Sequence, residues 1–177
     1  MTAGNHYYFG CAVPPAYATN YFPLIGILGG TSGFYLEQLD IVNNRDKNDS
    51  QSQVVVQLVV SADAGADFPT NANHGTPVIP GTPTSQSKWT AGNNWGLEGT
   101  GEQNLPYWSI QPGEQKTINF CEDRQPFIPS GSIVSLWLAL PGFWVAGGGW
   151  TGADVGPSGG TVSSILFINA WICEPTS

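Results

Sequence analysis

The residues in this sequence with the most obvious capacity for chemistry are carboxylates that stand close together along the chain. The pairs considered are Glu37 with Asp40, Glu98 with Glu102, and Glu122 with Asp123. The middle pair lies near Trp89, Trp95 and Trp108, and two carboxylates that flank a sugar ring can cleave a glycosidic bond. Because the sequence does not fix the separation of the two carboxyl groups, solvated loop acids beside interface aromatics are the favoured interpretation.

Histidines and oxygen-rich segments give a weak case for a metal site. His6 and His74 lie in Gly- and Asn-rich segments without a third nitrogen ligand, whereas a cupin iron or zinc site needs a cluster of imidazoles on barrel strands. The loop from Asn43 to Asp49 carries many oxygen donors, but its spacing is not that of an EF-hand, so a polar turn is favoured. Since a P-loop and a Cys-x-x-Cys motif are also missing from the sequence, we expect no cofactor, no metal and no catalytic residue.

The chain has three cysteines, Cys11, Cys121 and Cys173. An odd number leaves at least one thiol unpaired within the chain or joined to another chain in an oxidising setting. Cys121 and Cys173 end two expected strands and could approach each other, whereas Cys11 is the natural candidate for a contact with another molecule. Buried, reduced thiols are the alternative for all three.

Charge is scarce in this protein, and the shortage bears on its partners. The 5 Lys or Arg and 13 Asp or Glu residues are only 10% of the 177 residues, where a soluble domain usually carries about 25%. A surface so poor in charge predicts contact with other protein molecules rather than catalysis. The net charge of −8 and the dispersed basic residues argue against direct binding to nucleic acid.

The elements that would position these residues are short strands. The 23 Gly and 14 Pro residues interrupt nearly every candidate helix and predict an all-β protein. Prolines and glycines also break the two long uncharged stretches, so neither is expected to span a membrane as a helix. We expect strands at 24–28, 34–42, 53–61, 88–95, 105–110, 115–121, 132–140 and 162–173.

Side-chain alternation adds detail to several of these strands. In 34–42 the apolar residues have even numbers up to Leu36 and odd numbers from Leu39 onward. This switch predicts a bulge near Glu37 and Gln38. In 53–61 the even-numbered apolar residues form one face, with Gln57 and Ser61 on the other. Strand 132–140 is apolar on both faces and should be central or covered on both sides. Residues 62–104 and 142–160 are expected as long loops.

The strand layout favours a single jelly-roll β-barrel or sandwich of about eight strands over residues 31–177, with residues 1–30 as an extended N-terminal arm. An immunoglobulin-like sandwich fits less well, because the cysteines lack the required spacing around a tryptophan. The last strand could return beside the first. The arm and the second long loop supply the residues expected at an interface between molecules, namely Tyr7, Tyr8, Phe9, Cys11, Tyr21, Phe22, Trp144 and Trp150.

The chain length and the opening segment Met1 to Asn20 resemble the smaller major capsid protein of tailless icosahedral phages that have an internal membrane and infect thermophilic bacteria. No basic segment precedes an apolar core at the N-terminus, so we expect no secretory signal. The resemblance implies two single-jelly-roll proteins that form pseudo-hexameric capsomers over the membrane. It also implies a virion protein that is assembled in the host cytoplasm.

The sequence therefore predicts a structural shell protein, not an enzyme. It should associate with itself and with a second, larger capsid protein, and it should lie near the internal membrane or a minor membrane protein. The alternative is a carbohydrate-binding β-sandwich that uses Trp89, Trp95 and Trp108. A glycosidase that uses Glu98 and Glu102 is the third hypothesis.

Overall fold

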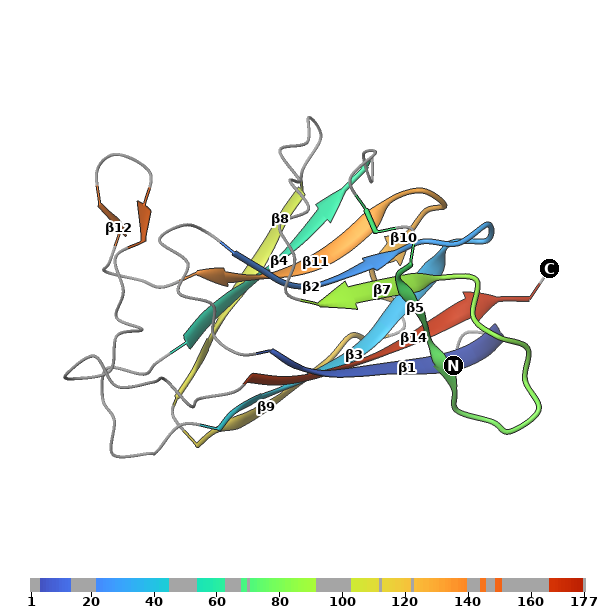
Figure 1. The fold of residues 1–177 in the computed structure, drawn as a ribbon, viewed down its shortest axis with the longest axis horizontal. Coiled ribbons are helices and arrows are strands. Elements are labelled where there is room, and N and C mark those ends of the chain that lie inside the picture. Colours follow the sequence, from blue (N-terminus) through green and yellow to red (C-terminus); the bar gives the residue numbers. More distant parts are fainter. Residues whose placement is uncertain are drawn as a thin grey trace.

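The computed structural model has an all-β fold, as the sequence predicted, and its strands form two antiparallel six-stranded sheets. It describes residues 4–13, 22–44, 54–62, 68–69, 71–91, 103–111, 113–121, 123–139, 144–145, 149–150 and 166–176. None of these residues lies in a helix, so the described part of the chain offers no helical segment that could cross a membrane. The two sheets form the two layers of a β-sandwich (Figure 1).

The first sheet contains both ends of the described chain. Its strands run in the order β10-β3-β14-β1-β6, and β9 also pairs with β3. The bounds are β1 Gly4–Val13, β3 Phe34–Asn43, β6 Thr76–Pro77, β9 Gln115–Asn119, β10 Phe127–Ile128 and β14 Leu166–Pro175. We call this layer the terminal sheet, because β1 and β14 lie side by side at its centre.

The second sheet, which we call the opposing sheet, runs in the order β5-β7-β2-β11-β4-β8. Its bounds are β2 Phe22–Leu28, β4 Val54–Ser61, β5 Asn73–His74, β7 Lys88–Ala91, β8 Gln103–Ile110 and β11 Ile133–Ala139. Two short strands, β12 (Trp144–Val145) and β13 (Gly149–Trp150), pair with each other in a separate two-stranded sheet. Each range that the sequence predicted as a strand overlaps one of the observed strands.

The hydrophobic core lies between the two sheets and follows the alternation of side chains. The last strand turns Leu166, Ile168, Ala170 and Ile172 inward, as predicted, and these residues are fully or almost fully buried. Val56 and Leu58 of β4 meet them from the opposing sheet, in the same core cluster. Because every second residue of a strand points to one face, this pattern leaves Phe167 and its alternating neighbours on the outer face of the terminal sheet.

The predicted bulge in β3 is present. Trp171 of β14 lies opposite Gln38, and Ile172 lies opposite Leu36, so Glu37 is the extra residue. Glu37 and Gln38 are both partly exposed, while Leu36 and Leu39 on either side of them are buried. The bulge therefore keeps the apolar residues on the core side and sends two successive polar side chains outward.

The opposing sheet is covered on both faces over β4 and β11. The predicted central position of β11 is confirmed, because it lies between β2 and β4 and all residues from Ile133 to Leu136 are buried. Ile133 and Val59 form a second cluster with Phe68, which follows β4 in the chain. Gln57 and Ser61, on the face of β4 away from the main core, are therefore buried as well.

The N-terminal segment differs from the extended arm that the sequence predicted. Gly4–Val13 forms β1, which pairs with all ten residues of β14, and Phe22–Leu28 forms β2 between β7 and β11. Tyr7, Phe9 and Cys11 turn toward the core, and Tyr8 between them is exposed. Because Tyr8 is also a large aromatic residue, the sequence shows no alternation of apolar and polar residues here. The segment is an integral part of the sandwich, and its prolines lie outside β1.

Adjacent residues of β14 allow a matched test of which face is core. We expect Ile168→Ala to lower the free energy of unfolding by about 2–5 kcal/mol, because it leaves a cavity between the sheets. We expect Phe167→Ala to cost less than Ile168→Ala, because the Phe167 side chain is 38% exposed and leaves no cavity between the sheets. Equilibrium unfolding in urea measures both values, and equal losses would contradict the assignment of faces.

Candidate functional site

Two of the three tryptophans predicted for a sugar-binding cleft, Trp89 and Trp108, do not lie together. Trp89 is in β7 and Trp108 is in β8, and three strands of the opposing sheet separate these two. At about 4.8 Å for each strand spacing the two strands are roughly 19 Å apart, and the register places Trp89 level with Gln103 rather than with Trp108. Both side chains are partly buried and pack against the core cluster, and Trp89 lies 6.2 Å from the ring of Phe9. Trp95, Glu98 and Glu102 lie outside the described residues.

The residues predicted for an interface fall into three groups. Tyr7 and Phe9 are buried in the core of their own chain, whereas Tyr8, between them, is 41% exposed. Cys11 is partly buried and packs against the same core. Tyr21 lies outside the described residues, and Phe22, Trp144 and Trp150 are described only by their backbone, in β2, β12 and β13.

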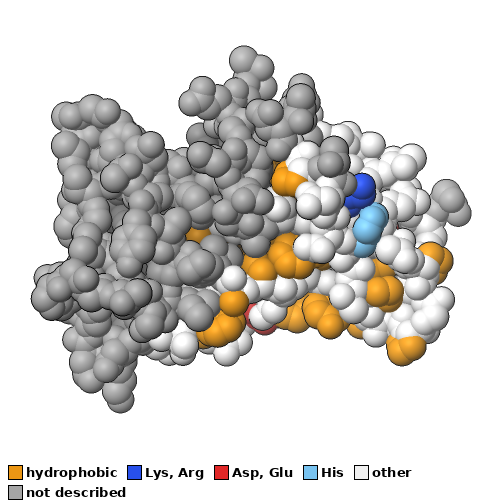
Figure 2. Space-filling view, in the orientation of Figure 1, with side chains coloured by type: hydrophobic (Ala, Val, Ile, Leu, Met, Phe, Trp, Pro, Cys, Tyr) orange, Lys and Arg blue, Asp and Glu red, His pale blue; other side chains and the backbone are white. Residues whose placement is uncertain are grey.

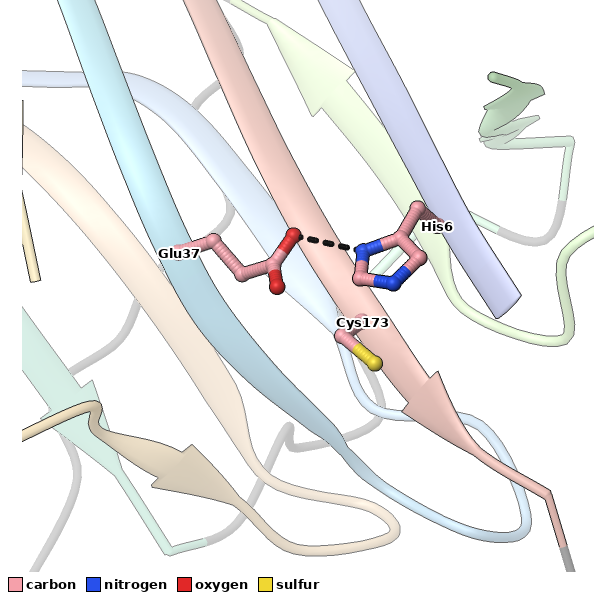
Figure 3. A group of neighbouring side chains, drawn as sticks. All are labelled: His6, Glu37 and Cys173. Carbon is pink, nitrogen blue, oxygen red and sulfur yellow. Dashed lines mark hydrogen bonds and ion pairs between the residues drawn. The ribbon is translucent and has the colours of Figure 1, made fainter. Parts of the chain in front are cut away.

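A cluster that sequence reasoning missed lies on the outer face of the terminal sheet. His6 from β1, Glu37 from β3 and Cys173 from β14 each offer one donor atom, and these atoms all lie within 4.8 Å of one another. His6 Nδ1 and Glu37 Oε2 are 2.9 Å apart. Figure 3 shows the two polar side chains reaching toward each other across β14, with the Cys173 side chain beside them.

The sheet register explains why these residues meet. His6 lies directly opposite Cys173 in the pairing of β1 with β14, and directly opposed residues of an antiparallel pair bring their Cβ atoms to about 4.5–5.5 Å. The bulge supplies Glu37 from the other side of β14. No local pattern in the sequence could have revealed this cluster, because its members come from the start, the first third and the end of the chain.

The cluster contains the residue types of a thiol nucleophile with a base and an orienting acid, but the thiol is poorly suited to attack. Cys173 is fully buried. Burial first, and then the Glu37 and Glu174 carboxylates, raise the pKa of its thiol to about 11. A catalytic cysteine instead needs a lowered pKa and access to solvent. The geometry therefore favours ligand binding or a structural role over nucleophilic catalysis.

Glu174, next to Cys173, points to the other side of β14 and fixes the segment before β7. Its carboxylate accepts hydrogen bonds from the backbone N–H of Ser87 at 2.7 Å, from that of Gln86 at 3.1 Å and from Ser85 Oγ at 3.2 Å. Tyr7 Oη also donates to the Pro83 carbonyl oxygen at 2.9 Å. This part of the loop predicted at 62–104 is thus held by its own chain, through β1 and β14.

The outer face of the terminal sheet is also rich in aromatic residues. Tyr8 of β1 lies opposite Trp171 of β14, and Phe167, which is 38% exposed, lies farther along the same face. At one edge of the sheet Phe127 contacts Tyr35, with ring centroids 4.8 Å apart. Beyond the opposite edge strand, Val78 and Ile79 are exposed. In Figure 2 the described surface shows several hydrophobic groups and few charged ones.

Comparisons of the chain with protein-family models, with curated proteins and with solved structures found no match.

The three cysteines should differ in reactivity. Cys121 is exposed, whereas burial raises the pKa of Cys11 from 9.0 to about 11, as it does for Cys173. With an Ellman reagent at pH 8 we expect one fast thiol, Cys121, and two slower ones, because burial lowers both the thiolate fraction of Cys11 and Cys173 and the access of the reagent to them. Cys121→Ser should remove the fast phase, and a fast phase that survives in this variant would contradict the assignment.

The same two thiols predict a loss of stability at high pH. Their pKa values are raised in the folded state, so the folded protein holds these protons more tightly than the unfolded chain does. Their contribution is complete below pH 9 and should be lost as the pH rises from 9 toward 11. Urea unfolding of the wild type and of Cys11→Ala across this window would measure it, and the variant should lose less than the wild type.

Replacing Glu174 should release the segment that it holds. We expect Glu174→Gln to destabilise the protein by about 1.5–3 kcal/mol, the usual range for a hydrogen bond to a charged group. Amide hydrogen exchange at Gln86 and Ser87 should accelerate most. Glu114→Gln is the matched control, because among the contacts described the Glu114 carboxylate accepts a hydrogen bond only from the exposed Gln111 backbone N–H, and an equal effect there would contradict the role of Glu174.

Proposed function

We propose that this protein is a structural component of a viral shell, which associates with itself and with a larger capsid protein over an internal membrane. The order of its strands supports a jelly roll. The longer strands pair as β1-β14-β3-β9 in one sheet and as β2-β11-β4-β8 in the other. Two interlocked Greek keys generate this order, and jelly rolls of this kind occur in viral capsid proteins, lectins and cupins.

Among these three classes, the positions of the described side chains favour a capsid protein. A cupin holds a metal with imidazoles inside its barrel, but here the interior is filled by aliphatic and aromatic residues. His6 lies on the outer face, and His74 is exposed. A lectin of the predicted kind needs adjacent tryptophans, yet Trp89 and Trp108 lie in strands at the two sides of the opposing sheet.

The single observation that carries the proposal is the outer face of the terminal sheet. Tyr8 and Phe167 are exposed there, in a chain with only 10% charged residues. Apolar area left in water costs about 25 cal/mol per Å², and patches of more than a few hundred Å² usually mark contact with another protein. Further copies of this chain and the larger capsid protein are the occupants that we propose.

Light scattering tests association directly. We expect the purified protein to be a dimer or larger at both low and high salt, because burial of apolar surface is not screened as exposed charge pairs are. The double variant Tyr8→Ser and Phe167→Ser should shift the protein toward monomer. Tyr107→Ser, which removes an exposed tyrosine from β8 of the opposing sheet, is the matched control.

Two results would argue against the shell proposal. A wild-type monomer at both salt concentrations would contradict it, and so would a double variant that still co-assembles with the larger capsid protein. Binding of the monomer to a glycan array would instead support the carbohydrate-binding alternative.

A further inference from the structure

The cluster of His6, Glu37 and Cys173 is a feature that the proposed function leaves unused. Its imidazole, carboxylate and thiol donors lie within 4.8 Å of one another on the outer face of β1, β3 and β14. We propose that these three residues bind one zinc ion, with water as the fourth ligand. The inference does not depend on the shell function, because it rests only on the geometry of the terminal sheet.

The donor set determines which cation fits. Zinc is bound by cysteine sulfur at about 2.3 Å, by histidine nitrogen at about 2.0–2.1 Å and by carboxylate oxygen at about 2.0–2.2 Å. Donors around one tetrahedral zinc ion are therefore about 3.3–3.6 Å apart. His6 Nδ1 and Glu37 Oε2 are 2.9 Å apart, so side-chain shifts of about an ångström would complete the geometry. Magnesium and calcium prefer oxygen donors and fit poorly here.

The sheet positions all three donors before any ion binds. The backbones of His6 and Cys173 are paired, and the bulge directs Glu37 outward beside them. Gly4 leaves room next to the sulfur, because a Cβ at this position would lie 2.6 Å from Cys173 Sγ. Binding therefore requires little ordering of the backbone, which reduces its entropic cost.

Burial and charge also suit a divalent cation. Cys173 is fully buried, while the side chains of His6 and Glu37 are 22% and 19% exposed, so an ion could enter from solvent and keep a water ligand. On binding, the thiol would release its proton to solvent. One thiolate and one carboxylate then neutralise the two charges of zinc. The ion would join three adjacent strands, including the first and the last.

The test uses the full chain with any affinity tag removed, because tag histidines also bind zinc. The protein is stripped with a chelator, incubated with zinc and desalted. Elemental analysis should find about one zinc per chain, and zinc should raise the melting temperature, whereas magnesium and calcium should not. Cobalt in place of zinc should give the ultraviolet thiolate-to-metal absorption band and the visible bands of tetrahedral cobalt.

Matched variants locate the site, since the chain contains a second histidine and other cysteines. We expect His6→Gln and Cys173→Ser to weaken zinc binding by more than about tenfold, the lower bound for changes that only reorient a ligand. His74→Gln and Cys121→Ser should bind as the wild type does. If Cys173→Ser fails to fold, His6→Gln still decides the matter, because its side chain is partly exposed.

Three outcomes would overturn the zinc proposal. These are a wild-type protein that retains no zinc, a His6→Gln variant that binds as tightly as His74→Gln, and cobalt spectra without the thiolate band. None of these outcomes bears on self-association, which light scattering measures separately.

Discussion

The pairing of the first described strand with the last is the constraint on which the other features depend. It extends from Gly4 opposite Pro175 to Val13 opposite Leu166, without a break in register. This register places Tyr7 and Phe9 in the same hydrophobic core as Ile168 and Ile172. It also sets His6 beside Cys173 and carries Glu174 to the segment that it holds. Because the pair joins the two ends of the chain, its formation closes a very long loop, which makes it costly in entropy and slow to form.

Three of the four sheet faces are covered, at least in part, by described residues of the chain itself. The two inner faces cover each other, and Phe68 covers part of the outer face of the opposing sheet, in a cluster with Val59 and Ile133 against which Ala72 also packs. The outer face of the terminal sheet has no such cover among the described residues, yet it carries Tyr8, Trp171 and Phe167. In a protein with few charges, this is the surface where association removes the most apolar area from water.

Much of the strand layout could be predicted from the sequence, because alternation with a period of two is a local signal. This signal correctly predicts the bulge at Glu37, the central position of β11 and the inward residues of β14. β1 was missed because Tyr8 obscures its alternation, and its true partner lies at the other end of the chain. The cluster of His6, Glu37 and Cys173 could not be predicted because its members lie far apart in the sequence. The sequence shows His6 only in a Gly- and Asn-rich segment, whereas strand pairing gives it a fixed position opposite Cys173.

Position along β14 separates the two surfaces that we propose. Cys173 and Phe167 are six residues apart on the same face, and at about 3.4 Å for each residue this places them roughly 20 Å from each other. A zinc ion bound at Cys173 is therefore too far from Phe167 to contact a molecule that is bound over Phe167. Tyr8, however, is only two residues from His6. Because strand pairing already fixes the backbone of both residues, zinc binding would leave the apolar surface that carries Tyr8 as it is, and the two proposals can be tested independently.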